Sequence, residues 1–225
     1  MTIYLDHAAT TPINAQALDA LNEQIKKLGN ASSVHNQGRA VRKDVEDARH
    51  KLSELIGSVP SEIIFTASGT EANNLALKGF YWKSGKKLIV TSNFEHHAVL
   101  DPVEWLVNHQ GAEVIYIPVK RDGYIDLDFL KKVVAERGNE IAVISIMHSN
   151  NELGSIQPIS QVVEIAGDIP VHTDAVQSFG KVEFNFDSLG VSAATISAHK
   201  LGGPLGVAAL VLKHGIDLAP LLHGG

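Results

Sequence analysis

The chain has 225 residues, with 19 Lys and Arg against 25 Asp and Glu, and a formal net charge of −6. This mild acidity does not suit a protein that coats nucleic acid or anionic lipid, because both need a basic surface. The sequence contains no cysteine, which excludes disulfides, thiolate metal sites and a cysteine nucleophile within these residues.

The first residues, Met1-Thr-Ile-Tyr-Leu-Asp-His7, have neither the basic region nor the apolar region of a secretory signal. No apolar run approaches the roughly 18 residues that a membrane span needs. We therefore expect a cytoplasmic protein with no membrane segment and no nucleic-acid partner.

Short runs rich in β-branched residues alternate with helical patterns along the chain. They predict strands at 62–67, 87–92, 113–119, 141–148, 169–174, 194–197 and 207–212. Helices are expected at 14–27, 41–56, 70–82, 97–109, 127–136 and 159–166. Nearly continuous apolar strands separated by helices indicate an α/β fold, with a mostly parallel central sheet and helices on both faces.

Two stretches fall outside this alternation. Residues 29–38 are predicted to form a long polar loop between two helices, which makes them a candidate functional loop. Residues 219–225 follow the last strand with no closing helix, and this end is typical of a truncated chain.

Ligands of such sheets bind beyond the carboxyl ends of the strands. The strand at 62–67 is followed by Ser68-Gly-Thr-Glu-Ala-Asn-Asn74, which opens a helix. Free N–H groups and the helix dipole favour an anion there, although taken alone the motif is more typical of an ordinary cap by Ser68 or Thr70. Neither a P-loop nor a dinucleotide-binding glycine motif occurs in the sequence.

A carboxylate, Asp174, ends the apolar strand at 169–174. Its burial is costly unless it meets a cation or several donors, and a structural role at the next turn is equally consistent with the sequence. His172 shares its strand face, but no third ligand has suitable spacing, so no metal site is expected.

A lysine, Lys200, follows the strand at 194–197 and opens a glycine-rich turn. Such a residue is usually a surface lysine, and the functional alternative is an amine nucleophile that reacts with a carbonyl compound. Ser197 and His199 can point to one side as hydrogen-bond donors. A Ser-His-Asp hydrolase is disfavoured because no G-x-S-x-G elbow occurs.

Together these signals meet the needs of pyridoxal phosphate, which requires a lysine for its aldehyde, a carboxylate for its ring nitrogen and a helix end for its phosphate. Asp174 and Lys200 are 26 residues apart (200 − 174), enough for a connection and the next strand. His96 could cover the ring, although by itself it is more typical of an ordinary first residue of a helix.

Seven motifs occur in an order that resembles the amino-terminal part of cysteine desulfurases, a class V branch of the type I pyridoxal-phosphate fold. They begin at Tyr4, Gly29, Ser68, Glu95, His148, His172 and Ser197. The resemblance implies an amino-terminal arm at 1–12 and a pyridoxal-phosphate-binding large domain at 13–225, truncated at its end, with the carboxy-terminal small domain absent.

The resemblance also implies residue roles. Lys200 would carry the cofactor and shuttle a proton, Asp174 would pair with the ring nitrogen, and His96 would stack on the ring and act as an acid or base. Gln177 would bond the phenolic oxygen, and Asn151 would lie near the substrate carboxylate. The phosphate would be held by Gly69, Thr70, Ser197 and His199.

The implied reaction converts L-cysteine to L-alanine and leaves a persulfide sulfur for iron–sulfur cluster or thionucleoside synthesis. Homodimers, together with sulfur-acceptor or scaffold proteins, are the implied partners. The family's sulfur-accepting cysteine and its substrate-binding arginine lie beyond Gly225, so this chain is expected to bind the cofactor weakly and not to turn over cysteine. The alternatives are another class V enzyme, such as a selenocysteine lyase or an aminotransferase, and a non-catalytic scaffold.

Overall fold

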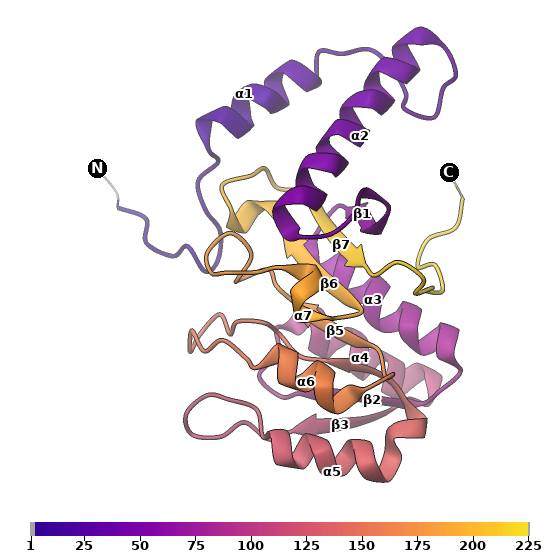
Figure 1. Ribbon diagram of the computed structural model, residues 1–225. Coiled ribbons are helices and arrows are strands. Elements are labelled where there is room, and N and C mark those ends of the chain that lie inside the picture. The colour runs from indigo at the N-terminus through magenta and orange to yellow at the C-terminus, as the bar shows by residue number, and fades with distance from the viewer. Residues whose placement is uncertain (1–2, 225) are drawn as a thin grey trace.

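The predicted alternation of strands and helices produces one seven-stranded sheet in the computed structural model, which describes residues 3–224 (Figure 1). The strand order is β1-β7-β6-β5-β4-β2-β3. The strands are β1 (Ile63–Thr66), β2 (Leu88–Ser92), β3 (Glu113–Ile117), β4 (Ile141–Ser145), β5 (Val171–Asp174), β6 (Ala193–Ser197) and β7 (Ala208–Leu212). Strand β7 pairs antiparallel with β1 and β6, and the other neighbouring strands pair in parallel, so the prediction of a mostly parallel sheet is confirmed.

Helices connect most of the strands. They are α1 (Ala15–Gln24), α2 (Asn36–Ile56), α3 (Gly69–Ser84), α4 (His97–Gln110), α5 (Leu127–Arg137), α6 (Ile159–Ala166) and α7 (Phe186–Leu189). Three short 3₁₀ turns complete the chain, η1 (Pro60–Glu62), η2 (Gly138–Glu140) and η3 (Ala198–Lys200).

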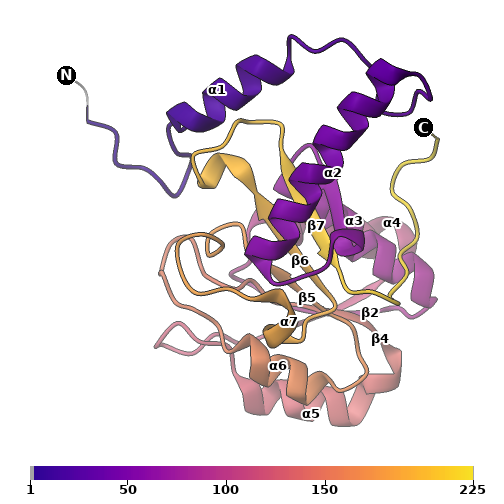
Figure 2. The same ribbon diagram turned by 45° about the horizontal axis from the view of Figure 1, so that its top comes forward.

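Helices cover both faces of the sheet, as expected, and each face has its own apolar core (Figures 1 and 2). On one face α3 and α4 pack on the sheet, so that Leu77 joins Ile89 in one cluster. On the other face α5 and α6 lie with α2 and α7, where Leu130 and Val90 belong to the second cluster. Ile89 and Val90 are neighbours in β2, and their opposite directions follow from the two-residue repeat of a strand.

The boundaries differ from the predicted ones by a few residues. The loop predicted at 29–38 is shorter, because α2 begins at Asn36, where the His35 ring accepts a hydrogen bond from the Gly38 amide at 3.3 Å. Helix α7 was not predicted, since it has only 4 residues. Strand β5 begins at Val171, directly after Pro170, which has no N–H to give to a sheet.

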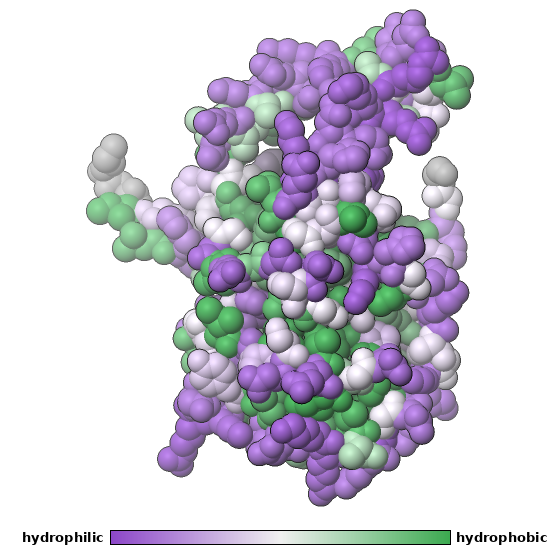
Figure 3. Space-filling view, viewed as in Figure 1, coloured by the Kyte–Doolittle hydropathy of each residue, from purple (hydrophilic) through white to green (hydrophobic). Residues whose placement is uncertain are grey.

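The amino-terminal segment is much less buried than the sheet. Helix α1 has no buried residue, and the side chains of Ile3, Leu5 and Leu28 are exposed. In Figure 3 the start of the described chain appears as a green hydrophobic extension on the left. The division of the chain into an arm at 1–12 and a domain at 13–225 stays a prediction. No helix within residues 3–224 is both long and apolar enough to cross a membrane.

The packing of α3 leads to a prediction about stability. Leu77 is fully buried between α3 and the sheet, so the substitution Leu77→Ala should lower the free energy of unfolding by about 2 to 5 kcal/mol. The matched control is Leu55→Ala, because Leu55 on α2 is 74 % exposed and its truncation should change the free energy by less than about 0.5 kcal/mol. Urea unfolding measures both, and equal effects of the two variants would contradict the assigned packing.

Candidate functional site

A cavity of about 570 Å³ lies at the carboxyl ends of the central strands. Its walls come from the ends of β5 and β6, from the segment after β4, from the first turns of α3 and α4, and from the amino-terminal arm. Parallel strands end at the same edge of a sheet, and this is why residues far apart in sequence meet here. All nine residues singled out from the sequence line this cavity: Gly69, Thr70, His96, Asn151, Asp174, Gln177, Ser197, His199 and Lys200.

Asp174 ends β5 with its carboxylate almost fully buried against the cavity. Its Oδ1 accepts a hydrogen bond from the Val176 amide at 2.9 Å, and its Oδ2 accepts one from Asn73 Nδ2 at 2.7 Å. Burial raises the pKa of Asp174, whereas these two donors and the neighbouring His96 and Lys200 act in the opposite direction. The carboxylate is therefore buried among donors, which suits an acceptor of a further N–H group.

The amino end of α3 presents free amides at the cavity. The Ser68 side chain caps the helix by accepting from the Glu71 amide at 3.1 Å, as the ordinary cap interpretation expects. Among residues 3–224, however, the amides of Gly69 and Thr70 have no acceptor. These amides and the positive end of a 16-residue helix can bind an anion.

Gly69 also brings the helix close to the neighbouring strand ends. A Cβ at this position would lie 3.1 Å from Val176 Cγ2 and 3.6 Å from Ser197 Cβ. A larger residue would push α3 away from the segment that follows Asp174 and from the end of β6. The glycine therefore permits a close approach between the free amides and the Ser197 hydroxyl.

Lys200 ends the short turn η3, directly after β6, and is half-buried. Its Nζ donates a hydrogen bond to the carbonyl of Ala8. Burial lowers the pKa of Lys200 and the charge of Lys181 lowers it further, whereas Asp174 and Asp6 act in the opposite direction. A lowered pKa increases the fraction of neutral amine, which is the nucleophilic form.

The amino-terminal arm is tied to the loop that carries Lys200. The amide and the hydroxyl of Thr11 both donate to the His199 carbonyl at 2.9 Å, and the Gly202 amide donates to Thr11 Oγ1 at 2.7 Å. The Asn14 amide in turn donates to the Gly202 carbonyl at 2.7 Å. These contacts join residues about 190 positions apart in sequence and hold the arm beside the cavity. Asp6 of the arm is one of the residues that line it.

Gln177 and His199, two further site residues predicted from the sequence, also contact the amino-terminal arm. Gln177 donates through Nε2 to the Ala8 carbonyl at 2.8 Å and accepts at Oε1 from Lys181 Nζ at 3.1 Å. The His199 ring lies 3.2 Å from Thr10 Oγ1, and burial lowers its pKa. The contacts of Gln177 with Ala8 and of His199 with Thr10 join the arm to the segments that follow β5 and β6.

His96 is the N-cap of α4, and its Nδ1 accepts a hydrogen bond from the Ala98 amide at 3.0 Å. Because Nδ1 is an acceptor, the neutral ring carries its proton on Nε2. The preceding residue, Glu95, is buried, and its Oε1 accepts from Ser92 Oγ at 2.6 Å and from the Met147 amide at 3.0 Å. Glu95, the residue before His96, thereby joins the end of β2 to the segment that follows β4.

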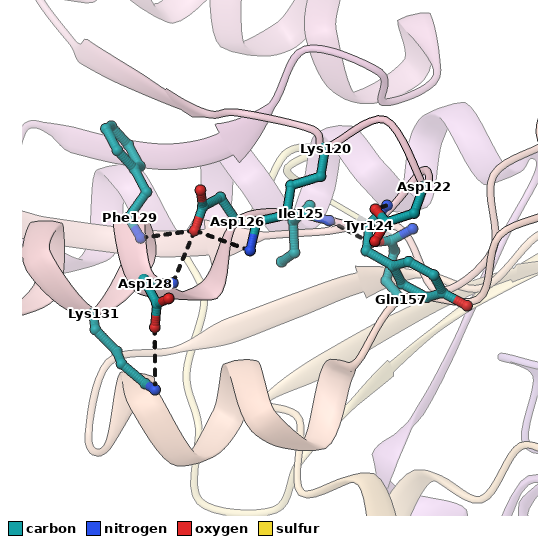
Figure 4. Close-up of polar contacts among 9 residues, drawn as sticks. All are labelled: Lys120, Asp122, Tyr124, Ile125, Asp126, Asp128, Phe129, Lys131 and Gln157. Carbon is teal, nitrogen blue, oxygen red and sulfur yellow. Dashed lines mark hydrogen bonds and ion pairs between the residues drawn. The ribbon is translucent and has the colours of Figure 1, made fainter.

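Gln157, at the end of the segment that contains Asn151, contacts the turn before α5 (Figure 4). Gln157 accepts from the Ile125 amide at 3.0 Å, and its Nε2 donates to the Gly123 carbonyl at 2.9 Å. Its own amide donates to the His148 carbonyl at 2.8 Å. The buried side chain thus joins the turn before α5 to the end of the segment that contributes Asn151, and the backbone amide of Gln157 closes this segment on His148.

Sequence reasoning missed several residues of the cavity, among them Asp6, Ala8 and Asn73. Asn73 had a readable signal, because it lies four positions after Gly69 and thus on the same helix face. Asp6 and Ala8 had none in the local pattern, since only the folded arm brings them to Lys200. No group of three or more His, Cys, Asp or Glu side chains within residues 3–224 is arranged to hold a metal.

Residues 3–225 match the family described as Aminotransferase class-V. The chain is 47 % identical to a cysteine desulfurase IscS of Dictyoglomus turgidum and 43 % identical to an IscS-like cysteine desulfurase of Mycobacterium tuberculosis. These matches cover 99 % of this chain but only 57 % and 58 % of the two relatives, so the chain spans little more than half of their length.

Two solved structures are similar over the whole chain. One is described as a NifS-like protein, with a TM-score of 0.94, 37 % identity and 62 % of its own chain covered. The other is SspA in complex with cysteine, with a TM-score of 0.94, 35 % identity and 65 % of its own chain covered.

The burial of Glu95 leads to a prediction about pH. Burial raises its pKa to about 8 from an ordinary value of 4.5, so between these values the folded chain binds a proton that the unfolded chain has lost. Stability from this group is therefore greatest at low pH and is lost as the pH rises toward 8, by up to about 1.4 kcal/mol per pH unit. The variant Glu95→Gln cannot titrate and should lack this loss.

Urea unfolding at several pH values between 5 and 8 measures the effect. The control is Glu54→Gln, which changes an exposed glutamate on α2 and should leave the pH dependence as in the unsubstituted chain. A Glu95→Gln variant with an unchanged pH dependence would show that Glu95 is ionised in the folded protein.

Proposed function

Because this chain belongs to the class V aminotransferase family, whose enzymes depend on pyridoxal phosphate, we propose that its cavity holds this cofactor for a cysteine desulfurase reaction. One observation carries the proposal: a half-buried amine, a buried carboxylate and the free amides of a helix end surround the same space of about 570 Å³. The amine belongs to Lys200, the carboxylate to Asp174 and the amides to Gly69 and Thr70.

The chemistry of the residues fits the three ends of the cofactor. The free amides of α3 and the hydroxyl of Ser197 are donors suited to a phosphate. The buried Asp174 carboxylate, which meets only donors in its recorded hydrogen bonds, suits a protonated ring nitrogen. The Lys200 amine, with its lowered pKa, suits the aldehyde.

When bound, pyridoxal phosphate supplies an aldehyde for covalent attachment and a ring that withdraws electrons from the substrate. Lys200 would hold the cofactor through its aldehyde and would move a proton at the substrate Cα. Asp174 would keep the ring nitrogen protonated, and His96 would cover the ring and serve as an acid or base through Nε2. Gln177 would donate to the phenolic oxygen, and Asn151 would bind near the substrate carboxylate.

The phosphate end involves four residues: Gly69, Thr70, Ser197 and His199. The first two donate from the backbone and the other two from their side chains. Thr11 supports this end by holding the His199 carbonyl.

The proposed substrate is L-cysteine, which is supported by the names of the relatives and by the neighbour solved in complex with cysteine. In the balanced reaction the C–S bond of cysteine breaks, a proton is added to its Cβ, and the sulfur joins an acceptor thiol. Alanine and a persulfide are the products. The 225 residues contain no thiol, so the acceptor belongs to a cysteine-bearing segment or to another protein.

We further propose that the active form is a homodimer in the cytoplasm, where thiols remain reduced. The sulfur would pass to acceptor or scaffold proteins of iron–sulfur cluster assembly, as the IscS names of the relatives suggest, or to thionucleoside synthesis.

Covalent attachment at Lys200 is the first test. The chain mixed with pyridoxal phosphate should develop a visible absorption band, and borohydride reduction should fix the label on the peptide that contains Lys200. The variant Lys200→Ala should show neither effect, whereas Lys213→Ala, which changes an exposed lysine after β7, should behave like the unsubstituted chain. A label that persists in Lys200→Ala would refute the assignment, and the absence of any label would favour a non-catalytic scaffold.

Turnover is the second test. Because these residues offer no thiol to receive sulfur, the 225-residue chain supplied with cofactor and L-cysteine should release sulfide no faster than its Lys200→Ala variant. The Lys200→Ala variant measures the background reaction of the free cofactor. Sulfide release clearly above this background would contradict the need for an acceptor cysteine on a protein segment outside these residues.

A further inference from the structure

Asn73 lines the cavity and contacts Asp174, but it has no role in the chemistry proposed above. Asn73 is fully buried in the second turn of α3 and belongs to the lining of the cavity. Its Nδ2 donates to Asp174 Oδ2 at 2.7 Å, across 101 positions of sequence. Its Oδ1 is buried and has no partner among the described residues.

We propose that Asn73 is a positioning residue, which orients the Asp174 carboxylate toward the cofactor's ring nitrogen. This inference rests on the proposed function, since it concerns the same site. Asn73 acts through Asp174 and is not itself a reacting group.

The hydrogen bonds of Asp174 explain how this positioning operates. The Val176 amide binds Oδ1 from within the same turn, and this contact alone restrains only one oxygen of the carboxylate. The Asn73 amide binds Oδ2 from a different element and fixes the plane of the carboxylate. Each carboxylate oxygen retains an unused lone pair, so Asp174 can still accept an N–H group from the cavity.

The charge of Asp174 also depends on Asn73. Burial favours the neutral acid, whereas the neighbouring His96 and Lys200 favour the carboxylate. The nearby charge of Asp174 in turn contributes to the raised pKa of Glu95. A hydrogen bond from a neutral amide to a buried carboxylate stabilises the charged form. Loss of the Asn73 donor should therefore favour the neutral acid, which is a poor partner for a protonated ring nitrogen.

The place of Asn73 on α3 couples the two ends of the proposed cofactor site. Gly69 and Asn73 are four residues apart, so they share a helix face and are separated by about 6 Å along the axis. The free amide of Gly69 and the side-chain amide of Asn73 are thus carried by one rigid segment. Helix α3 thereby sets the distance between the anion-binding end and the carboxylate.

The test uses two ligands that differ only at the ring nitrogen. These are pyridoxal phosphate and its 1-deaza analogue, in which C–H replaces that nitrogen. The variant Asn73→Leu keeps the branching of the side chain but removes the donor. It should weaken binding of pyridoxal phosphate about 10- to 100-fold, whereas binding of the analogue should change less than about 3-fold.

The matched control is Asn74→Leu, the same substitution at the next position of α3, where the side chain bonds the Thr70 carbonyl and does not contact Asp174. Its affinities for both ligands should change less than about 3-fold. Equal weakening of both ligands in Asn73→Leu, or no weakening of either, would overturn the proposal.

A second readout needs no cofactor. In the cofactor-free chain, Asn73→Leu should raise the pKa of Asp174, followed by the carboxyl carbon chemical shift in NMR, whereas Asn74→Leu should leave it unchanged. An unchanged pKa in Asn73→Leu would count against the positioning role. If the Leu variant does not fold, Asn73→Ala provides the same two measurements.

Failure of the proposed function has a different signature. In that case the unsubstituted chain would bind neither ligand at Lys200, while the pKa comparison would still decide whether Asn73 controls Asp174.

Discussion

The burial of one negative charge at the edge of the sheet constrains much of this structure. Asp174 lies almost fully buried at the end of β5, where an isolated carboxylate is strongly disfavoured. Its two recorded donors come from the following turn and from α3, so the amino end of α3 must lie close to the strand ends. Gly69 permits that approach, because any Cβ there would press against Val176.

A second constraint is the contact between the amino-terminal arm and the loop around Lys200. Thr11 and Asn14 bond the loop around Lys200, and Ala8 accepts hydrogen bonds from both Gln177 and Lys200. The arm thereby contributes Asp6, Ala8 and Ala9 to the lining of the cavity. Because Asp6 raises the pKa of Lys200 while Lys181 lowers it, the arm also takes part in the electrostatics of the amine.

The polar side chains of the central strands hold the sheet edge together without adding charge. His172 is fully buried, and its ring bonds Ser145 on β4 at 2.9 Å and Thr195 on β6 at 3.0 Å. Burial lowers its pKa to about 3, so the ring is neutral at physiological pH. It therefore links the three neighbouring strands β4, β5 and β6.

The alternating strand and helix patterns of the sequence were enough to predict the parallel sheet and the helices on both faces, and the resemblance of its motifs to a known family supplied nine of the residues that line the cavity. Strand and helix periods are local properties, and strand ends such as Asp174 and Ser197 must meet at one edge in a parallel sheet. The contacts of Asn73 with Asp174 and of Ala8 with Lys200 follow only from the folded chain, because these pairs are 101 and 192 positions apart and no local pattern encodes such contacts. The direction of each pKa shift likewise depended on the fold, since burial and neighbouring charges arise only when distant segments pack together.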